Sequence, residues 1–150
     1  MTRILAAGGG FLLAVLWMDL MFDVQAREVR RDAGAAREAV IASIASYYRR
    51  VTTDAFPMNR LIGAVMLVTV GGSVVQAVGV GISSWQAWLS PLLSGLPVGL
   101  AALRVVPNAV RLGARRDPID VQHEIAHAIL RDHVLCFVAI AAFIAIELSW

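Results

Sequence analysis

Four long apolar segments, separated by polar stretches, dominate the hydropathy pattern of this 150-residue chain. The first segment is broken only by Asp19. As a helix, each segment is long enough to cross the roughly 30 Å hydrocarbon layer of a bilayer. The expected spans are residues 4–22, 61–82, 89–105 and 121–149. We therefore expect an all-α protein, a polytopic bundle of four transmembrane helices that forms a single membrane domain over residues 1–150.

The first apolar segment has one competing interpretation, a cleaved signal peptide. Arg3 would then be its basic start, and Val24, Gln25 and Ala26 would resemble a small-residue cleavage site. The apolar stretch is longer than that of a signal peptide, however, and it contains an acid near its end. We interpret it as a membrane helix.

Residues 23–60 form a polar arm between the first two spans, with seven arginines and five acids. Apolar residues in the arm recur at spacings of three and four, which predicts an amphipathic cytoplasmic helix. They are Val29, Ala33, Ala36, Val40, Ile44, Tyr47 and Val51. Two placements stay open. The helix lies on anionic lipid headgroups through residues 27–55, with residues 47–50 anchored at the interface, or it packs on the protein's own cytoplasmic face.

The second span is rich in glycine. Its glycines, which lie on more than one side of the helix, are Gly63, Gly71, Gly72 and Gly79. Small residues allow the close backbone approach that holds helices together in lipid. We therefore expect this span in the interior of the bundle. Gly-rich spans also offer contacts for a homo- or hetero-oligomer.

The start of the last helix is predicted by Asp117, Pro118 and Asp120. An aspartate at the N-cap, a proline in the first turn and an acid near the positive end of the helix dipole each favour this boundary. Residues 106–117, just before it, are polar and basic, and we expect them to form a connection outside the bilayer.

Composition supports a membrane protein, since 59% of the residues are hydrophobic, above the roughly 45–50% of soluble domains. The net charge is only +2, and the arginines are interleaved with acids. Such a surface lacks the one-sided basic face that neutralises nucleic-acid phosphates, so no nucleic acid is expected as a partner.

The distribution of arginine predicts the orientation. Seven arginines follow the first span and five lie between residues 104 and 131, against Arg3 alone on the other side. By the positive-inside rule the Arg-rich connections are cytoplasmic, so with four spans both termini face outward. We expect a bacterial inner membrane location, with Trp85, Trp88 and Trp150 at the outer interface.

The one motif typical of catalysis is His123, Glu124 and His127, which has the HExxH form. On a helix its two imidazoles share a face and can bind one metal, while the glutamate handles protons on a bound water. His133 stands at the spacing of the third ligand in a longer zinc-protease signature, but the glycine that turns that chain is here Leu130. In an unbroken helix His133 points away from the other two histidines, which argues against a protease.

A second arrangement uses Asp19 and Asp23 at the end of the first span. If the first and last helices are neighbours, these carboxylates can face the stripe of Asp120, His123 and His127. Two acids and two imidazoles on facing helices are typical of bundle sites for zinc, iron or manganese, with Glu124 as the flanking base.

Simpler roles compete with this metal site. Asp19 can pair with Arg60 or Arg104, and the two histidines of the motif can lie in solvent or at the interface. Three further ionisable residues lie near the ends of the last span, where an interfacial position is expected. They are Asp132, His133 and Glu147.

Two classes of function follow. We favour a non-enzymatic accessory or scaffold protein whose cytoplasmic arm recruits lipid or a partner. The alternative is a metal-binding membrane protein, redox, hydrolytic or ion-handling, that uses the Asp/His site. The sequence leaves open whether the protein is an enzyme.

Overall fold

The computed structural model describes residues 1–28, 34–80 and 84–149. Every regular element in these ranges is helical. In chain order they are α1 (Thr2–Asp23), α2 (Gln25–Glu28), α3 (Ala35–Arg49), the π-helical turn η2 (Arg50–Asp54), α4 (Met58–Val80), α5 (Trp85–Leu100), the π-helical turn η3 (Ala101–Val105), α6 (Val106–Ala114) and α7 (Ile119–Leu148). Some of the predicted features lie outside the described residues, namely Val29 and Ala33 of the arm, residues 81–82 of the second span, and Trp150.

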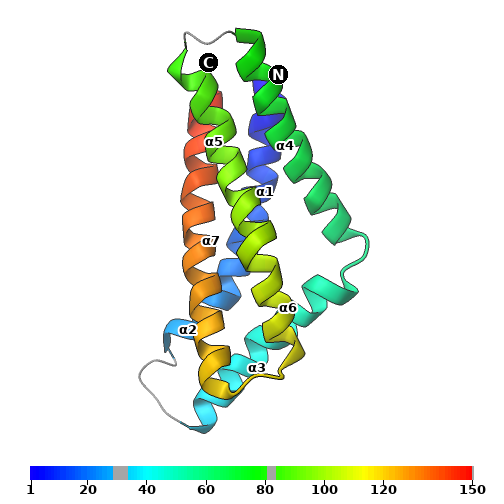
Figure 1. Ribbon diagram of the computed structural model, residues 1–150, viewed down its shortest axis with the longest axis vertical. Coiled ribbons are helices and arrows are strands. Elements are labelled where there is room, and N and C mark those ends of the chain that lie inside the picture. Colours follow the sequence, from blue (N-terminus) through cyan, green and yellow to red (C-terminus); the bar gives the residue numbers. More distant parts are fainter. Residues whose placement is uncertain (29–33, 81–83, 150) are drawn as a thin grey trace.

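Four helical stretches in the described chain are long and apolar enough to cross a membrane, and each overlaps one predicted span. They are Thr2–Arg27, Met58–Gly79, Trp85–Ala114 and Ile119–Leu148. These helices form an elongated bundle in which α7 packs against both α1 and α5, and α4 packs against α5 and α1 (Figure 1). Both termini lie at one end of the bundle, and α3 crosses the other (Figure 1).

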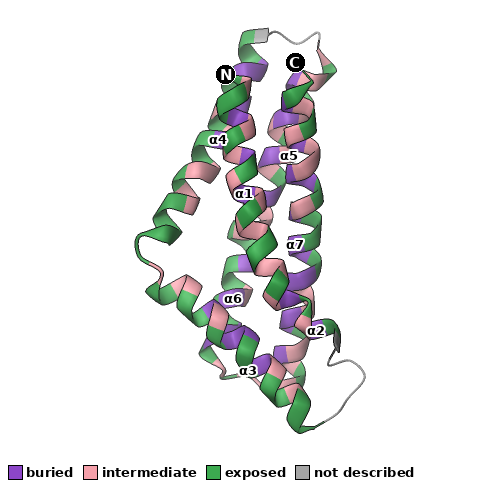
Figure 2. Ribbon diagram, turned by 180° about the vertical axis from the view of Figure 1, so that it is seen from behind, coloured by how far each residue is buried: buried purple, intermediate pink, exposed green. Residues whose placement is uncertain are grey.

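The interior position expected of the Gly-rich span belongs instead to the last helix. Within the apolar stretch of α7, 44% of the residues are buried, against 22% in α4, and Figure 2 shows the same contrast. A Cβ atom added to Gly63, Gly71 or Gly79 would meet nothing within 4 Å, whereas one on Gly72 would meet Leu5. Most of these glycines therefore face away from the neighbouring helices of this chain.

The third apolar helix is longer than predicted. It begins at Trp85 and continues through η3 into α6, so most of the polar connection expected at residues 106–117 is helical. Pro107 lies in the first turn of α6, directly after this π-helical turn. The N–H of Val106 bonds to the carbonyl of Ala101 across the wider π-helical turn.

The predicted N-cap of the last helix is wrong. Residue Pro118 occupies that position, and no side chain caps the first turn of α7. The Asp117 carboxylate instead accepts two hydrogen bonds of 2.8 Å from the Arg111 guanidinium. A bidentate, charge-assisted pair with arginine is stronger than a single bond to a backbone N–H, which explains the outcome.

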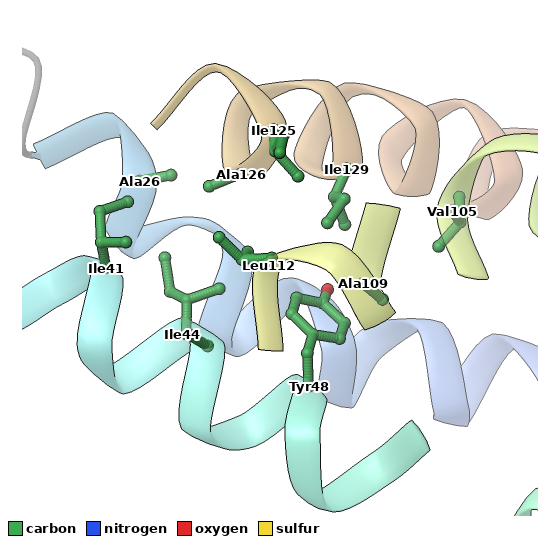
Figure 3. Close-up of a cluster of buried hydrophobic side chains, with 11 residues drawn as sticks. Ala26, Ile41, Ile44, Tyr48, Val105, Ala109, Leu112, Ile125, Ala126 and Ile129 are labelled. Atoms are coloured by element: carbon green, nitrogen blue, oxygen red, sulfur yellow. The ribbon is translucent and has the colours of Figure 1, made fainter. Parts of the chain in front are cut away.

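The arm helix α3 packs on the protein, the second of the two placements left open by the sequence. Ile41, Ile44 and Tyr48 project from α3 toward Leu112 of α6 and Ile129 of α7 (Figure 3). Together with Ala26, Ala45, Val105, Ala109, Ile125 and Ala126 they form a buried apolar cluster. The arm is therefore attached to the end of the bundle by a small core of its own.

A close helix crossing fixes the position of α3 on α6. A Cβ atom added to Gly113 would lie 3.0 Å from the backbone nitrogen of Arg49 and 3.1 Å from its Cα. Only glycine leaves room for this approach of the two backbones.

Candidate functional site

A group of buried ionisable side chains lies where α1, α3 and α7 meet. His133, on α7, is 5% exposed, and Asp23, at the end of α1, is 1% exposed. The Nδ1 atom of His133 lies 2.6 Å from Oδ2 of Asp23, and its Nε2 atom lies 3.9 Å from Oδ2 of Asp19. The imidazole thus stands between two carboxylates that are one helical turn apart on α1.

Two tyrosines of the arm complete this group. The Tyr47 hydroxyl donates a hydrogen bond of 2.6 Å to Oδ1 of Asp19, and the Tyr48 hydroxyl donates one of 2.5 Å to Oδ1 of Asp23. The Tyr47 ring also stacks on Phe22, with 4.0 Å between the ring centroids. We call these five residues, Asp19, Asp23, Tyr47, Tyr48 and His133, the carboxylate–tyrosine cluster. It joins the arm to the bundle by polar contacts beside the apolar core.

A separate ion pair lies next to the cluster. Asp132 is 3% exposed, and the Nε atom of Arg104 lies 3.1 Å from its Oδ2, in contact but without hydrogen-bond geometry. Arg131 approaches the other carboxylate oxygen at 3.6 Å. These arginines balance the charge of Asp132 and leave the cluster itself with two carboxylates and one imidazole.

The charge of the cluster makes it suited to holding protons. Even with the imidazole protonated, two ionised carboxylates leave a net charge of −1 in a buried site. Charges taken out of water are costly unless they are neutralised or hydrogen-bonded, and here each carboxylate accepts a hydrogen bond from a tyrosine. The distances of 2.5–2.6 Å are direct hydrogen-bond contacts with no space for a metal ion between the paired atoms.

Burial also shifts the titration of the two tyrosines. Desolvation, followed by the charges of the nearby aspartates, raises the pKa of both Tyr47 and Tyr48 above the ordinary value of 10.0. Both phenols therefore stay protonated, as hydrogen-bond donors, at pH values where an exposed tyrosine ionises.

We expect the native protein in detergent to show no tyrosinate absorbance near pH 10, in contrast to the unfolded chain. The chain has two tyrosines, so the signal belongs to this cluster alone. Since the unfolded chain releases these protons first, the free energy of unfolding should fall as the pH rises above 10.0. Ionisation of both tyrosines near pH 10 in the folded protein would contradict this placement.

The structure distributes the predicted metal-site residues over separate places. Asp19 and Asp23 meet His133, whereas Asp120 pairs with Arg37 at 2.7 Å. His123 and His127 contact each other, with 3.3 Å between their Nε2 atoms, and Glu124 is exposed. Among the described residues, no group of three or more His, Cys, Asp or Glu side chains is arranged to hold a metal ion.

Asp19 does not pair with either of the arginines expected as its simpler partners, Arg60 and Arg104. Arg104 contacts Asp132, and the guanidinium of Arg60 lies over the ring of Phe56, 4.9 Å from its centroid. Asp19 bonds to a tyrosine instead, because α3 packs over the end of α1 and brings a phenol within reach.

The three residues of the last span for which an interfacial position is expected are buried between helices of the bundle. Asp132, His133 and Glu147 are all at most 5% exposed, and each contacts polar groups on other helices. The free-energy cost of burying each group is reduced because each has an ion-pair partner or a hydrogen bond. Sequence reasoning missed the roles of His133 and of the two tyrosines, although helical spacing contained part of the signal.

Comparison with models of protein families, with curated proteins and with solved structures gave no match. The site consists of an imidazole in direct contact with one carboxylate, a second carboxylate close by, and two phenols carried by a separate helix.

Proposed function

We propose that the chain is an integral protein of a bacterial inner membrane, with the arm and α6 on the cytoplasmic side and both termini outside. The apolar faces of the candidate spans support this, since large side chains such as Leu67, Val78 and Leu103 are more than 70% exposed. A surface of this kind is stable in lipid and costly in water. The excess of arginine at the α3 end supports the orientation.

We further propose that it is a non-enzymatic accessory protein whose arm is held against the bundle according to the protonation of the carboxylate–tyrosine cluster. One observation carries the proposal: the two arm tyrosines bond directly to the two aspartates that flank His133. A change of charge on the aspartates therefore acts at the contact that holds the arm.

The direction of the effect follows from the charges that face the cluster. Asp19 and Asp23 come from α1, the two phenols from α3, and His133 from α7, with the Asp132–Arg104 pair alongside. Docking of α3 covers these groups and excludes water, so it favours the state with the least net charge. Protons thus stabilise the docked arm, and rising pH loosens it. The raised pKa of the two phenols acts in the same direction, since the docked arm favours their protonated form.

A thiol on the buried face of α3 measures arm docking. In a C136A background, Ala45→Cys places the thiol at a position that is 1% exposed, and Ser43→Cys places one on the exposed face of the same helix. The ratio of their labelling rates by a polar maleimide cancels the pH dependence of the thiol itself. We expect this ratio to rise as the pH rises.

Neutral isosteres provide the control. With D19N and D23N together, the two carboxylate charges are absent at every pH, so the ratio should stay low and constant. A ratio that is independent of pH in the parent protein, or one that responds equally in the D19N/D23N variant, would refute the proposed coupling.

In this proposal the arm itself contacts lipid or a partner protein. Arg49 and Arg50 are exposed at the end of α3, where they can meet anionic headgroups. The open faces of Gly63, Gly71 and Gly79 on α4 are available for a homo- or hetero-oligomer.

A metal-binding function is the second candidate, and one distance favours it. The separation of 3.3 Å between the Nε2 atoms of His123 and His127 is close to that of two nitrogen ligands at about 2.0–2.1 Å from one tetrahedral zinc ion. Elemental mass spectrometry of the purified protein and of the H123A/H127A variant tests it. Stoichiometric zinc, iron or manganese that the variant loses would support a metal site, and equal traces in both would dismiss it.

A further inference from the structure

A second buried polar cluster lies toward the other end of α7, between α4 and α5. Glu147 is 2% exposed, and it accepts hydrogen bonds from the Ser90 hydroxyl and from the Gln76 amide, whose Nε2 lies 3.2 Å from Oε2. Beside it, Ser73 and Ser94 lie 3.0 Å apart through their hydroxyl oxygens. We call these five residues the Glu147 cluster.

This cluster has more acceptors than donors. Among the described residues no arginine or histidine forms an ion pair with Glu147, so its carboxylate is buried without a balancing charge. The Oε1 atom of Gln76 is buried with no hydrogen-bond partner in the described chain, and it belongs to the amide that contacts Glu147. The Nε2 atom of this amide faces the carboxylate, so its Oε1 points away, and a half-turn of the amide would bring the unpartnered oxygen to the Glu147 side. A buried carboxylate without a balancing charge favours a positive group at this place.

The chemistry of the oxygen atoms in the cluster indicates which positive group can bind there. Carboxylate, amide and hydroxyl oxygens are hard ligands, suited to hard cations rather than to soft or borderline metals. Only one of them carries a charge, so a monovalent ion neutralises the site, whereas a divalent ion would leave a buried positive charge. Sodium and a proton both meet these conditions.

We propose that the Glu147 cluster is a monovalent cation site in which Na⁺ and a proton compete for the carboxylate. Glu147, the Oε1 atom of Gln76 and the Ser90 hydroxyl oxygen are its ligands. With Na⁺ bound, the Gln76 amide turns over so that Oε1 replaces Nε2 on the Glu147 side, and the Ser90 hydroxyl turns its lone pairs to the ion. With a proton on Glu147, the acid donates to the oxygen of the same turned amide. The site shares no residue with the carboxylate–tyrosine cluster.

Carbodiimide labelling of the protein in liposomes tests this competition. A hydrophobic carbodiimide reacts with a protonated, membrane-buried carboxyl group, and peptide mass spectrometry separates Glu147 from Asp19 and Asp23. We expect Na⁺ at ten times its dissociation constant to slow modification of Glu147 by about tenfold, because occupancy leaves about a tenth of the sites free. Choline chloride at equal ionic strength should have no effect.

Three variants sharpen the result. E147Q should show no labelling at this position, and Q76L and S90A should keep the labelling but lose most of the protection by Na⁺. Size-exclusion profiles matched to those of the parent protein would establish that each variant is folded. If Glu147 is labelled at a rate that Na⁺ does not change, or is protected equally by choline, the cation site is refuted. Neither outcome alters the labelling of A45C, which tests the arm.

Discussion

Replacement of Asp23 by alanine is expected to lower the free energy of unfolding by about 3–5 kcal/mol, the usual cost of removing one member of a buried ionic pair. The carboxylate accepts from Tyr48 and contacts His133, so the truncation leaves two buried polar groups without their partner. Denaturing-detergent titration in mixed micelles, followed by tryptophan fluorescence, measures the change.

Two further substitutions separate this mechanism from general damage. Asp23→Asn keeps the shape and one acceptor oxygen, so its cost should be well below that of alanine. Asp54 is exposed, and Asp54→Ala should be neutral within about 0.5 kcal/mol. Equal losses for D23A and D54A would show that the Asp23 contacts contribute little to the folded state.

Phe143→Ala is the second substitution for which we expect a large effect, a loss of about 3–5 kcal/mol from the cavity it creates. The Phe143 ring is fully buried and fills the space left by a glycine on α1. A Cβ atom on Gly9 would lie 3.1 Å from Cδ1 of this ring and 2.8 Å from Cγ1 of Ile144. Packing of this kind is the main force between helices in lipid.

The same contact predicts non-additive mutations. Gly9→Ala alone should destabilise the bundle by about 1–3 kcal/mol through overpacking. In the F143A background the contacts with the ring are absent and the contact with Ile144 remains, so the cost should shrink. Gly10→Ala is the matched control, since a Cβ atom there meets nothing within 4 Å. Additive costs in the G9A/F143A pair would contradict this packing.

The long apolar helices were predictable from sequence because each is determined by the hydropathy of its own residues. A run of about twenty apolar residues fixes a candidate span whatever it contacts. The boundary at Asp117 was not predictable, since the choice between capping a helix and pairing with Arg111 depends on where α6 lies. For the same reason the glycines of α4 did not reveal which helix is central.

The candidate site was predictable in part. The spacing of Asp19 and Asp23 placed them on one face of α1, and the condition on which the predicted site depended, that the first and last helices are neighbours, holds in the structure. Their partner was missed because His133 was considered as a third ligand beside His123 and His127 and was otherwise expected at the membrane interface. Along α7 the buried residues Ala126, His133, Ile140 and Glu147 recur every seven residues, which marks one interior face. That spacing was visible in the sequence, whereas the contribution of the arm tyrosines needed the position of α3.

The most direct test of the coupling between proton and arm is ¹⁵N NMR of His133 in lipid bilayers. The chain has three histidines, so H123Q and H127Q together leave His133 as the single imidazole signal. We predict that its ring-nitrogen shifts change with pH over the range in which the A45C thiol becomes accessible, and that D19N/D23N abolishes the change in thiol accessibility. If, in the protein with both aspartates, the His133 signal stays constant while the arm is released, or changes while the arm stays docked, the proposed coupling is contradicted.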